Sequence, residues 1–344
     1  MDINIDKQIV FSVVEMDALD INEYYGFKNK ALFTTLDWLR FVRDDSKVSP
    51  LIIRITSDVD GRLVGYFTSM VTRKFGFKII GSPFSGWSTC WMGFDVVDGV
   101  DKMTLVKPLV EYLIKKQKAS YIQITDRDFT IEQAVANKFK YGSCHTLELE
   151  INRTDEELFK VFKTDCRNFI RQFERRGAKL EIVQPSEEFA KQYYSQLQDV
   201  FAKQGMVPTY SLEKVKCMMK HFAGTDRILC QRVVDPEGNC IATSIFLGFN
   251  KKFFFWGGAS WRSGQHYRPN EYMIWNAIKY WRGLGYEIFD MVGARDYKRK
   301  FGPHDVCYAS LEFARFPFLL SLKRIAGILY FKMLSLKGTI KGKK

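Results

Sequence analysis

Hydrophobic and polar residues follow two different spacings along the first half of the chain. Alternation of apolar and polar positions is typical of β-strands, and apolar positions three or four residues apart are typical of amphipathic helices. The pattern predicts a helical region over 31–41 and helices over 102–116 and 131–137. It predicts strands over 9–14, 51–56, 63–71, 77–80, 121–124 and 145–151. An Asp-Val-Asp-Gly turn at 58–61 indicates a hairpin between the second and third of these strands.

The second half repeats this order of elements. Thr154 and Glu157 form a capping-box pattern, which predicts the start of one long basic helix ending near Gly177. Further helices are predicted over 188–203, 212–222 and 270–283, and strands over 179–183, 228–234, 241–249, 253–256, 286–290 and 307–314. The repeated order indicates a duplicated unit of the α/β class with a mixed sheet. We expect one domain over 1–152, a second over 153–315, and a basic amphipathic tail over 316–344.

Composition agrees with two domains and adds a preference for anionic partners. The 344 residues are 46% hydrophobic and 15% aromatic, which is enough apolar material for two cores. The net charge of +13 favours nucleotide phosphates, anionic lipids or RNA as partners. Seven lysine and arginine residues of the tail, between 323 and 344, supply more than half of this excess.

Cysteine and histidine usage indicates the compartment and argues against a metal site. The seven cysteines stand singly without CxxC spacing, and the four histidines are scattered. The first residues are acidic and alternate in polarity, unlike a signal peptide, and no apolar run is long enough to span a bilayer. These features predict a reduced, cytoplasmic protein with no zinc or other metal site.

Candidate chemistry concentrates between Lys251 and Gly302. An aromatic strand over 253–256 ends in two glycines, which suits a close approach by another backbone or a ligand. A loop with several cations follows, then Asn270 at the predicted N-cap of a helix, and then a strand ending at Asp290. A basic turn over 295–302 comes last. Open sheets bind ligands at such strand ends.

These motifs resemble the GNAT acyltransferase fold, and the duplication resembles the FemAB-like branch of that superfamily. That branch includes peptidoglycan-bridge aminoacyltransferases and the acyltransferase domains found beside exopolysaccharide and cellulose genes. The residues that carry the resemblance are the basic helix 167–177, Gly257-Gly258-Ala259-Ser260, Arg268-Pro269-Asn270, Gly285 with Phe289-Asp290, and the turn 297–302. The resemblance implies two tandem GNAT-like domains, with the active site in the second.

The resemblance also implies an activity and roles for individual residues. It implies direct attack of an amine on an acyl-CoA thioester or on an aminoacyl-tRNA, without a covalent enzyme intermediate. Positioning and oxyanion stabilisation then matter most. The catalytic candidates are Lys298, which would stabilise the oxyanion, its neighbour Tyr297, and Asp290. The substrate-binding candidates are Arg167, Arg171, Arg262, Arg268, Asn270, Arg299 and Lys300. The cofactor-binding candidates are Gly257, Gly258, Ala259 and Ser260.

Simpler interpretations stand beside these roles. Lys298, Arg299 and Lys300 form a pattern also typical of a solvated basic turn, and Asp290 is equally a strand-end residue that bonds the next loop. Arg167 and Arg171 lie one helical turn apart and would grip a phosphate together, or would simply be solvated. We expect Lys298 to be an exposed loop residue whose removal leaves the fold intact.

The identity of the donor stays open from the sequence. The loop before the helix at 270 holds one glycine, whereas GNAT enzymes that use acyl-CoA usually have a glycine-rich pyrophosphate loop there. Anion binding remains feasible through the helix N-terminus and Arg268.

The sequence is compatible with three functions, of which two are enzymatic and one is non-catalytic binding. The first is an N-acyltransferase that moves an acyl group from acyl-CoA to an amino group of a sugar or of a cell-envelope or exopolysaccharide precursor.

The second is an aminoacyl-tRNA-dependent peptidoglycan-bridge ligase, and the third is a non-catalytic basic nucleic-acid-binding protein. The expected partner is a nucleotide- or lipid-linked glycan acceptor, with nucleic acid a partner only where the donor is tRNA. The tail 316–344 is dense in apolar residues with only positive charges. Such a segment either lies peripherally on an anionic membrane or packs on the domain.

Overall fold

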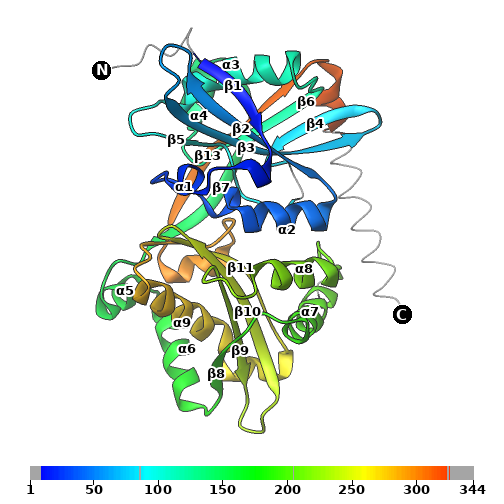
Figure 1. Cartoon of the computed structure of the whole chain (residues 1–344). Helices are drawn as coiled ribbons and strands as arrows, with labels where there is room; N and C mark the ends of the chain where they lie inside the picture. The colour runs from blue at the N-terminus through cyan, green and yellow to red at the C-terminus, as the bar shows by residue number, and fades with distance from the viewer. Residues whose placement is uncertain (1–8, 85–86, 204, 324, 326–344) are drawn as a thin grey trace. The chain divides into compact units, whose positions relative to one another are not determined.

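The computed structural model describes residues 9–84, 87–203, 205–323 and 325 (Figure 1). The chain forms two compact units. Unit 1 comprises residues up to Cys144 together with a segment that begins at Cys307, and unit 2 runs from His145 to Val306. None of the helices in these described ranges is both long and apolar enough to cross a membrane. The described helices and strands agree with the α/β class that the sequence predicts.

Unit 1 is a mixed sheet with helices against it. Its strands are, in order across the sheet, β1 (Ile9–Val14), β2 (Ser49–Ser57), β3 (Leu63–Lys74), β4 (Phe77–Ser82), β6 (Tyr121–Thr125) and β13 (His304–Ala314). The short β5 (Phe94–Val96) pairs with β3, and of the strand pairs described in this unit β4 and β6 alone run parallel. The helical segments are η2 (Met16–Ala18), α1 (Ile21–Tyr25), η3 (Leu32–Thr34), α2 (Leu36–Ser46), α3 (Lys102–Lys115) and α4 (Ile131–Ala136). Figure 1 shows α2 and α3 on opposite faces of this sheet.

The core of unit 1 lies between α3 and the sheet. Leu105, Leu109 and Leu113 recur at helical spacing on α3 and are fully buried. They belong to one apolar cluster with Ile122 of β6 and Leu311 of β13. The last strand of the sequence is therefore a core strand of the first unit.

Unit 2 has the same kind of sheet. Its order is β7 (Lys140–Glu150), β12 (Ile288–Asp290), β11 (Lys252–Ser260), β10 (Cys240–Phe249), β9 (Ile228–Val234) and β8 (Lys179–Val183). Among the strand pairs just given, β11 and β12 alone run parallel. The helical segments are α5 (Asp155–Val161), α6 (Thr164–Arg175), α7 (Glu187–Ala202), α8 (Leu212–Phe222), η4 (Arg262–Tyr267), α9 (Pro269–Gly283) and η5 (Asp296–Phe301). In Figure 1, α6 and α9 lie on one side of the sheet and α7 and α8 on the other.

Aromatic stacking fixes α9 against the strands of unit 2. The ring of Phe253 stacks on Phe289 with centroids 4.3 Å apart, and on Trp281 at 5.7 Å. All three rings are fully buried, because β11, β12 and α9 each turn an apolar position toward the same layer. This layer fixes the two parallel strands where they are paired.

The predicted domain division and the observed units differ at the end of the chain. The segment 307–314 closes the second predicted domain, 153–315, but in the structure it belongs to unit 1. The physical reason is its strand pairing: Ser310 to Ala314 of β13 pair with Thr125 to Tyr121 of β6. Unit 1 also ends at Cys144 instead of residue 152, because β7 continues from one unit into the other.

The single long helix predicted from Thr154 to Gly177 is wrong, since the structure has two helices there. The capping box of Thr154 and Glu157 is confirmed at the start of α5. The chain leaves the helical conformation at Phe162 and Lys163. Phe162 is buried against Trp275 and Phe301, and burial of this ring turns the backbone inward before α6 begins.

The tail lies largely outside the described residues, which end at 325. Within the described part, Leu319 is buried and the Lys323 ammonium pairs with Glu312 at 2.6 Å. Lys323 also donates to the Tyr121 hydroxyl at 2.8 Å. The first turns of the tail therefore pack on unit 1.

Candidate active site

The two parallel strands of unit 2 separate after three paired positions. Lys252, Phe253 and Phe254 of β11 pair with Ile288, Phe289 and Asp290 of β12, and β11 then continues alone on that side as far as Ser260. The register between β10 and β11 shifts near Trp256, so that Trp256 has no partner residue on β10. This irregularity is a β-bulge. The bulge and the lost neighbour leave one edge of β11 open from Phe255 onward.

The corresponding two strands of unit 1 do not separate in this way. There β4 stays paired with β6 as far as Ser82 and Ile124. The backbone of Phe84 lies so close to Gly81 that a Cβ atom there would be 2.4 Å from it, and the Phe84 ring meets Tyr121 edge-on at 6.0 Å. The open strand edge is therefore a feature of unit 2.

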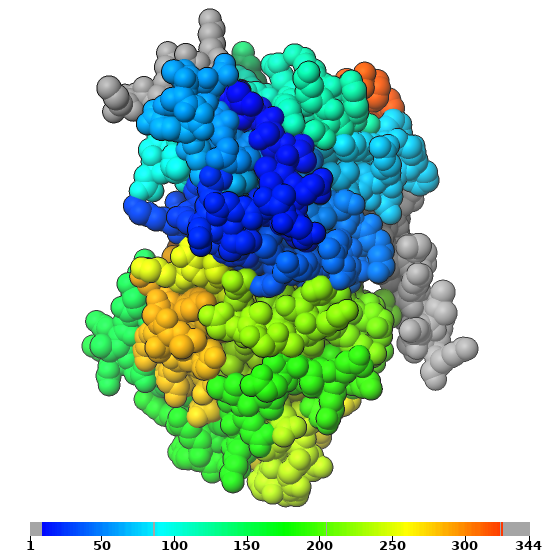
Figure 2. Space-filling model, in the orientation of Figure 1, coloured from blue at the N-terminus to red at the C-terminus, as the bar shows by residue number. Residues whose placement is uncertain are grey.

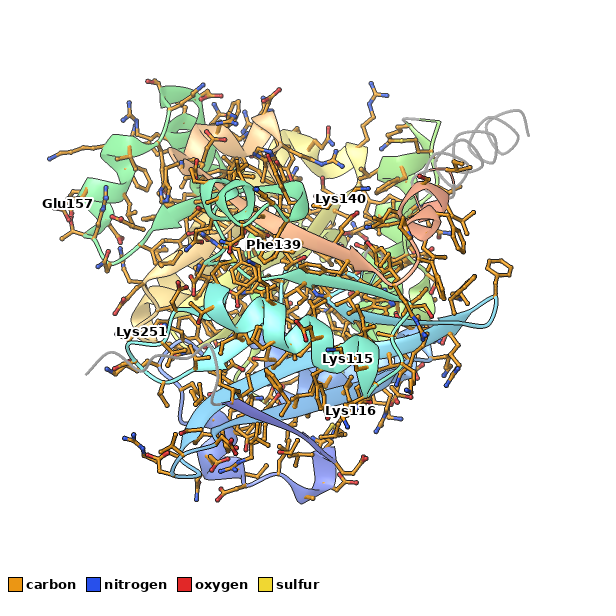
Figure 3. All side chains as sticks on the ribbon, turned by 90° about the horizontal axis from the view of Figure 1, so that it is seen from above. Lys115, Lys116, Phe139, Lys140, Glu157 and Lys251 are labelled. Atoms are coloured by element: carbon orange, nitrogen blue, oxygen red, sulfur yellow. The ribbon has the colours of Figure 1, made fainter. Side chains whose placement is uncertain are left out.

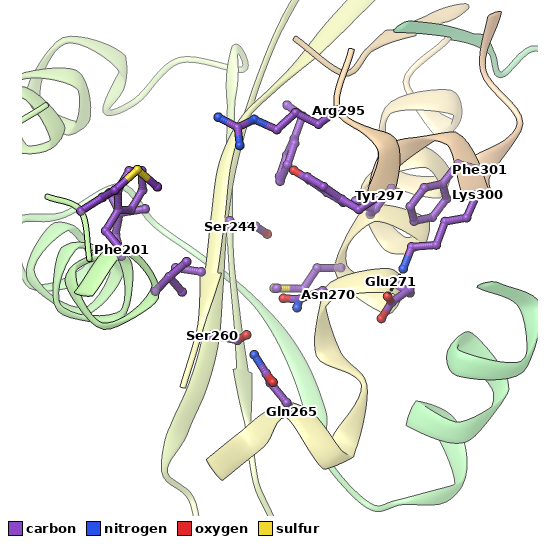
Figure 4. A pocket seen from close by; sticks show the side chains of 18 residues that line it. Phe201, Ser244, Ser260, Gln265, Asn270, Glu271, Arg295, Tyr297, Lys300 and Phe301 are labelled. Atoms are coloured by element: carbon purple, nitrogen blue, oxygen red, sulfur yellow. Dashed lines mark hydrogen bonds and ion pairs between the residues drawn. The ribbon is translucent and has the colours of Figure 1, made fainter. Parts of the chain in front are cut away.

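A cavity of about 450 Å³ lies at the open edge of β11 (Figure 4). Its walls come from the end of α7, from β10 and β11, from the start of α9, and from η5, all within unit 2. Its lining residues are Leu197, Val200, Phe201, Met206, Ser244, Phe255, Gly258, Ala259, Ser260, Gln265, Asn270, Glu271, Met273, Ile274, Arg295, Tyr297, Lys300 and Phe301. The residues from α7 are apolar, whereas those from β10, β11, α9 and η5 include both polar and apolar side chains.

Six predicted site residues line this cavity. They are Gly258, Ala259 and Ser260 on β11, Asn270 on α9, and Tyr297 and Lys300 on η5. Although distant in sequence, these three segments lie around one space because β11, α9 and η5 all end or begin at the same edge of the sheet. Figure 4 shows Tyr297 reaching in from η5, while Ser260 lies next to Gln265.

Tyr297 offers a protonated hydroxyl to the cavity. Its side chain is 51% exposed in the free protein. Partial burial raises the pKa of its phenol, and the nearby charge of Arg295 opposes that shift. Because the ordinary value already lies near 10, the hydroxyl is a hydrogen-bond donor at neutral pH.

Lys300 is not available as a free cation, since its ammonium pairs with the Glu271 carboxylate across the cavity wall. The two side chains are largely buried and join η5 to the first turn of α9. Arg295 differs, because it is exposed and has no ion-pair partner among the residues that the structure describes. Figure 4 shows the Arg295 side chain near Tyr297.

Gly257 lies beside the cavity but does not line it. A Cβ atom on this residue would lie 2.2 Å from the Tyr193 hydroxyl, which bonds the Tyr210 hydroxyl at 2.7 Å. Glycine is therefore required here by the close approach of α7 to β11. Tyr193 itself is fully buried, as expected of a packing residue.

Lys298 lies away from the cavity lining. The expectation of an exposed lysine is wrong, because only 4% of its surface is accessible. Its ammonium donates to the backbone carbonyl oxygens of Met291, Val292 at 2.7 Å and Gly293 at 3.4 Å. It therefore joins η5 to the loop that follows β12 and holds the segment that carries Arg295 and Tyr297.

Asp290 is fully buried at the end of β12. Its Oδ1 accepts hydrogen bonds from the Thr146 hydroxyl at 2.6 Å and from the Val292 N–H at 2.7 Å. Its Oδ2 is buried without a hydrogen-bond partner among the described residues. Burial raises the pKa of this carboxyl to about 6, against the two hydrogen bonds, which lower it. These contacts match the strand-end interpretation of Asp290.

The start of α9 differs from the prediction. The helix begins at Pro269 with Arg268 as its N-cap, whereas the sequence pattern places the N-cap at Asn270. Proline suits the first helical position, because its missing N–H has no partner there anyway. Arg268 adopts the left-handed conformation, with its guanidinium over the Phe169 ring at 4.3 Å and its Nε buried without a partner among the described residues.

The remaining predicted cations lie outside the cavity lining. Arg167 donates to the Phe159 carbonyl at 3.0 Å, and Arg171 lies over the Phe159 ring at 5.9 Å, so both share one face of α6. Arg299 makes two hydrogen bonds of 2.7 Å to Asp305. Arg262 is exposed on η4. The structure thus does not bring these four arginines together with Tyr297.

Sequence reasoning missed several residues that shape the cavity. Arg295 lies in the predicted basic turn, but the candidate residues chosen from that turn are the later cations Lys298, Arg299 and Lys300. Ser244 forms part of a buried polar chain in which its hydroxyl meets Gln231 at 3.2 Å, and Gln231 donates to Asn276 of α9 at 3.1 Å. No local signal marks Ser244, because the strand around it reads as an ordinary buried strand.

The part of the chain that the structure describes contains no evident metal-binding site. No group of three or more histidine, cysteine, aspartate or glutamate side chains is placed to hold an ion there. Cys166 is buried, and burial raises the pKa of its thiol to about 12, which keeps it protonated.

Comparison with known proteins agrees with this architecture. Residues 160–299 match the family described as the acetyltransferase (GNAT) domain. A search of curated proteins returned no significant sequence match. This part of the chain therefore carries a GNAT acetyltransferase domain, and the protein is, by class, an acyltransferase.

Most of the chain also resembles solved structures in its fold. FemX superposes with a TM-score of 0.73 at 14% identity, over 90% of this chain and 99% of that one. A conserved protein of unknown function from Bacteroides thetaiotaomicron VPI-5482 gives 0.54 at 11% identity, over 89% of this chain and 100% of that one. A tandem GNAT protein from the clavulanic acid biosynthesis pathway gives 0.50 at 12% identity, over 88% and 98%. These likenesses concern the fold, which is a tandem of two GNAT-like units.

Proposed function

We propose that unit 2 transfers an acyl group from an acyl-CoA thioester to an amino group of a sugar or of a cell-envelope or exopolysaccharide precursor. The observation that carries this proposal is the cavity at the open edge of β11, which Tyr297 lines. An extended thioester arm can lie along a strand edge that no other strand covers, because the backbone groups of that edge are free to bond it.

The lining residues favour direct attack over a covalent intermediate. No cysteine or histidine is among the residues that line the cavity, and the Ser244 hydroxyl already bonds Gln231. A site without an activated nucleophile accelerates acyl transfer by holding the amine against the carbonyl and by stabilising the oxyanion.

The reaction balances without any further reactant. The amine nitrogen forms a bond to the carbonyl carbon, and the carbon–sulfur bond breaks as the tetrahedral intermediate collapses. The nitrogen loses one proton and the leaving thiolate gains one. Tyr297 is suited to donate a hydrogen bond to the oxyanion or a proton to the thiolate, since its phenol stays protonated at neutral pH.

Arg295 gives the site a preference for an anionic substrate. This residue lines the cavity, is exposed and has no ion-pair partner among the described residues, so an incoming phosphate or carboxylate needs to displace no carboxylate. Nucleotide-linked and lipid-linked glycan precursors both carry phosphate near the sugar, and either would satisfy this group.

The test is a donor and acceptor panel with the full-length protein. Acyl-CoA donors and charged tRNAs are each offered with amino-sugar acceptors, and mass spectrometry follows the N-acylated product. We expect CoA release that depends on the acceptor amine. Transfer from charged tRNA with no use of any acyl-CoA would overturn the proposed donor, and the absence of transfer from either would overturn the activity.

The matched variant for this assay is Tyr297→Phe, with Tyr141→Phe as the control. Tyr297→Phe should lower kcat by about 100-fold, because it removes one donor to the transition state, and should leave the melting temperature unchanged. Tyr141 is an exposed tyrosine of unit 1, and its loss should change neither quantity. An unchanged kcat in Tyr297→Phe would remove Tyr297 from the mechanism.

A further inference from the structure

An aromatic ring projects into solvent at the tip of the β3–β4 hairpin in unit 1. Phe75 is 95% exposed. It and Gly76 form a two-residue loop between the paired Lys74 and Phe77, and both have positive φ, of 51° and 81°. A hairpin loop of this kind favours asparagine followed by glycine, and a bulky residue with positive φ is unfavourable. Neither the turn nor the core of unit 1 therefore explains a phenylalanine at this position.

More exposed apolar side chains follow β13 at the same end of the sheet. Phe316, Phe318, Leu322 and Ile325 are each exposed over 40% or more of their surface. The ring of Phe318 lies 6.1 Å from that of Phe77, the residue directly after the hairpin loop. Single exposed apolar residues are ordinary, but two neighbouring segments that both expose them form a patch.

Strand pairing brings a third segment to this end. Tyr121 begins β6 and pairs with Ile79 of β4 on one side and with Ala314 of β13 on the other. Just before it, the Ser120 N–H donates to the Lys78 carbonyl at 2.8 Å, and the Arg315 N–H donates to the Ser120 carbonyl at 3.0 Å. The loop after α3 therefore lies between the hairpin and the residues that follow β13.

The three segments carry only positive charge. Residues 73–78, 115–120 and 315–323 contain eight lysine and arginine residues and no aspartate or glutamate. The exposed cations among them are Arg73, Lys74, Lys115, Lys116, Lys118 and Arg315. Figure 3 labels Lys115 and Lys116 at the end of α3, and Figure 2 shows the light-blue hairpin at the edge of unit 1. We call these three segments the basic rim.

We propose that the basic rim of unit 1 docks the protein on an anionic membrane surface, with Phe75 and the apolar residues after β13 inserted between the lipid headgroups. Aromatic and aliphatic side chains surrounded by lysine and arginine are the composition that anionic interfaces bind. Nucleic acid would bind the lysine and arginine side chains, but unlike a membrane it offers no apolar environment for the exposed Leu322 and Ile325. This inference concerns unit 1 and does not depend on the acyl donor or the acceptor of unit 2.

The test measures binding of the full-length protein to vesicles of phosphatidylcholine mixed with phosphatidylglycerol, with pure phosphatidylcholine vesicles as the reference. We expect binding to the anionic vesicles that weakens as salt is raised. Phe75→Asn should weaken it at least about tenfold, because it removes one inserted ring. The variant is expected to fold normally, since asparagine suits the positive φ of this loop.

Matched controls come from the opposite end of the same sheet. Val59 is exposed in the β2–β3 turn, and Val59→Asn should leave vesicle binding unchanged. Lys74→Gln should weaken binding about fivefold at low salt, whereas Arg62→Gln, which changes the net charge equally in the β2–β3 turn, should not.

Three results would overturn the proposal. They are no binding to anionic vesicles, equal binding by the wild type and Phe75→Asn, and binding to transfer RNA that displaces the vesicles and is insensitive to Phe75→Asn. Equal binding would place membrane contact on residues beyond the basic rim. Amine acylation in solution, measured in parallel without vesicles, separates failure of this proposal from failure of the proposed function.

Discussion

The ammonium of Lys298 lies among three backbone carbonyl oxygens of the loop that follows β12. Removing the ammonium group leaves these buried carbonyl oxygens without a hydrogen-bond donor. We expect Lys298→Met to lower the free energy of unfolding by about 1–3 kcal/mol and to lower activity indirectly, by loosening the segment that carries Tyr297. Chemical denaturation measures the first effect.

Lys179→Met is the control for this loss, because Lys179 is an exposed lysine of the same unit. It should unfold at the wild-type denaturant concentration. If Lys298→Met lost activity at full stability, a direct catalytic role for Lys298 would be supported instead.

Asp290 should make stability depend on pH. Burial raises the pKa of its carboxyl to about 6 in the folded protein, above the ordinary value of 3.8. The folded state then holds this proton more tightly than the unfolded state does, so the contribution is full below about pH 4 and is lost as the pH rises through about 6.

The comparison that tests this is wild type against Asp290→Asn, unfolded in urea at pH 5 and at pH 7.5. The wild type should gain stability relative to the variant at the lower pH, within a limit of about 3 kcal/mol. A difference that is the same at both pH values would show that Asp290 does not titrate in this range.

At the scale of single elements, the close packing of β11 against α7 determines the shape of the cavity. Gly257→Ala would bring a Cβ atom to within 2.2 Å of the Tyr193 hydroxyl. We expect a loss of about 1–3 kcal/mol in stability and a lower activity, because the strand or the tyrosine has to move. Thermal unfolding together with the transfer assay measures both.

Two further variants make this prediction specific. Adding Tyr193→Phe to Gly257→Ala should restore part of the stability, since it removes the atom that clashes. Gly283→Ala, at the end of α9, meets no atom within 4 Å and should be neutral or stabilising. If Gly257→Ala behaved like Gly283→Ala, the close approach of α7 would not be what requires the glycine.

At the scale of the whole molecule, β13 connects the end of unit 2 to the sheet of unit 1. Leu311 is fully buried in the core of unit 1, although it follows unit 2 in sequence. Leu311→Ala should cost about 2–5 kcal/mol and should raise hydrogen exchange in β4 and β6. Exchange in β9 and β10 should stay at the wild-type rate.

Leu247→Ala provides the reciprocal measurement, because Leu247 is a buried leucine of β10 in unit 2. It should raise exchange in β9 and β10 and leave β4 and β6 protected. If Leu311→Ala loosened the strands of unit 2 first, residues 307–314 would belong to the second unit, as the predicted division has them.

The sequence by itself determined the duplicated order of elements, the α/β class, the likeness to GNAT and most strand positions. These follow from local spacing, since alternation and helical periodicity are properties of a few consecutive residues. It also indicated Gly258, Ala259, Ser260, Asn270 and Tyr297, because strand ends and turns are marked by glycine and polar residues.

Only the tertiary structure decided which of the cations face the cavity and which unit each strand joins. Lys298 is buried and Arg295 exposed within one short turn, because the loop after β12 supplies carbonyl oxygens to one and not to the other. Likewise, β13 joins unit 1 because it pairs with β6, nearly two hundred residues earlier in the chain. Such long-range pairing leaves no trace in the local pattern of either segment.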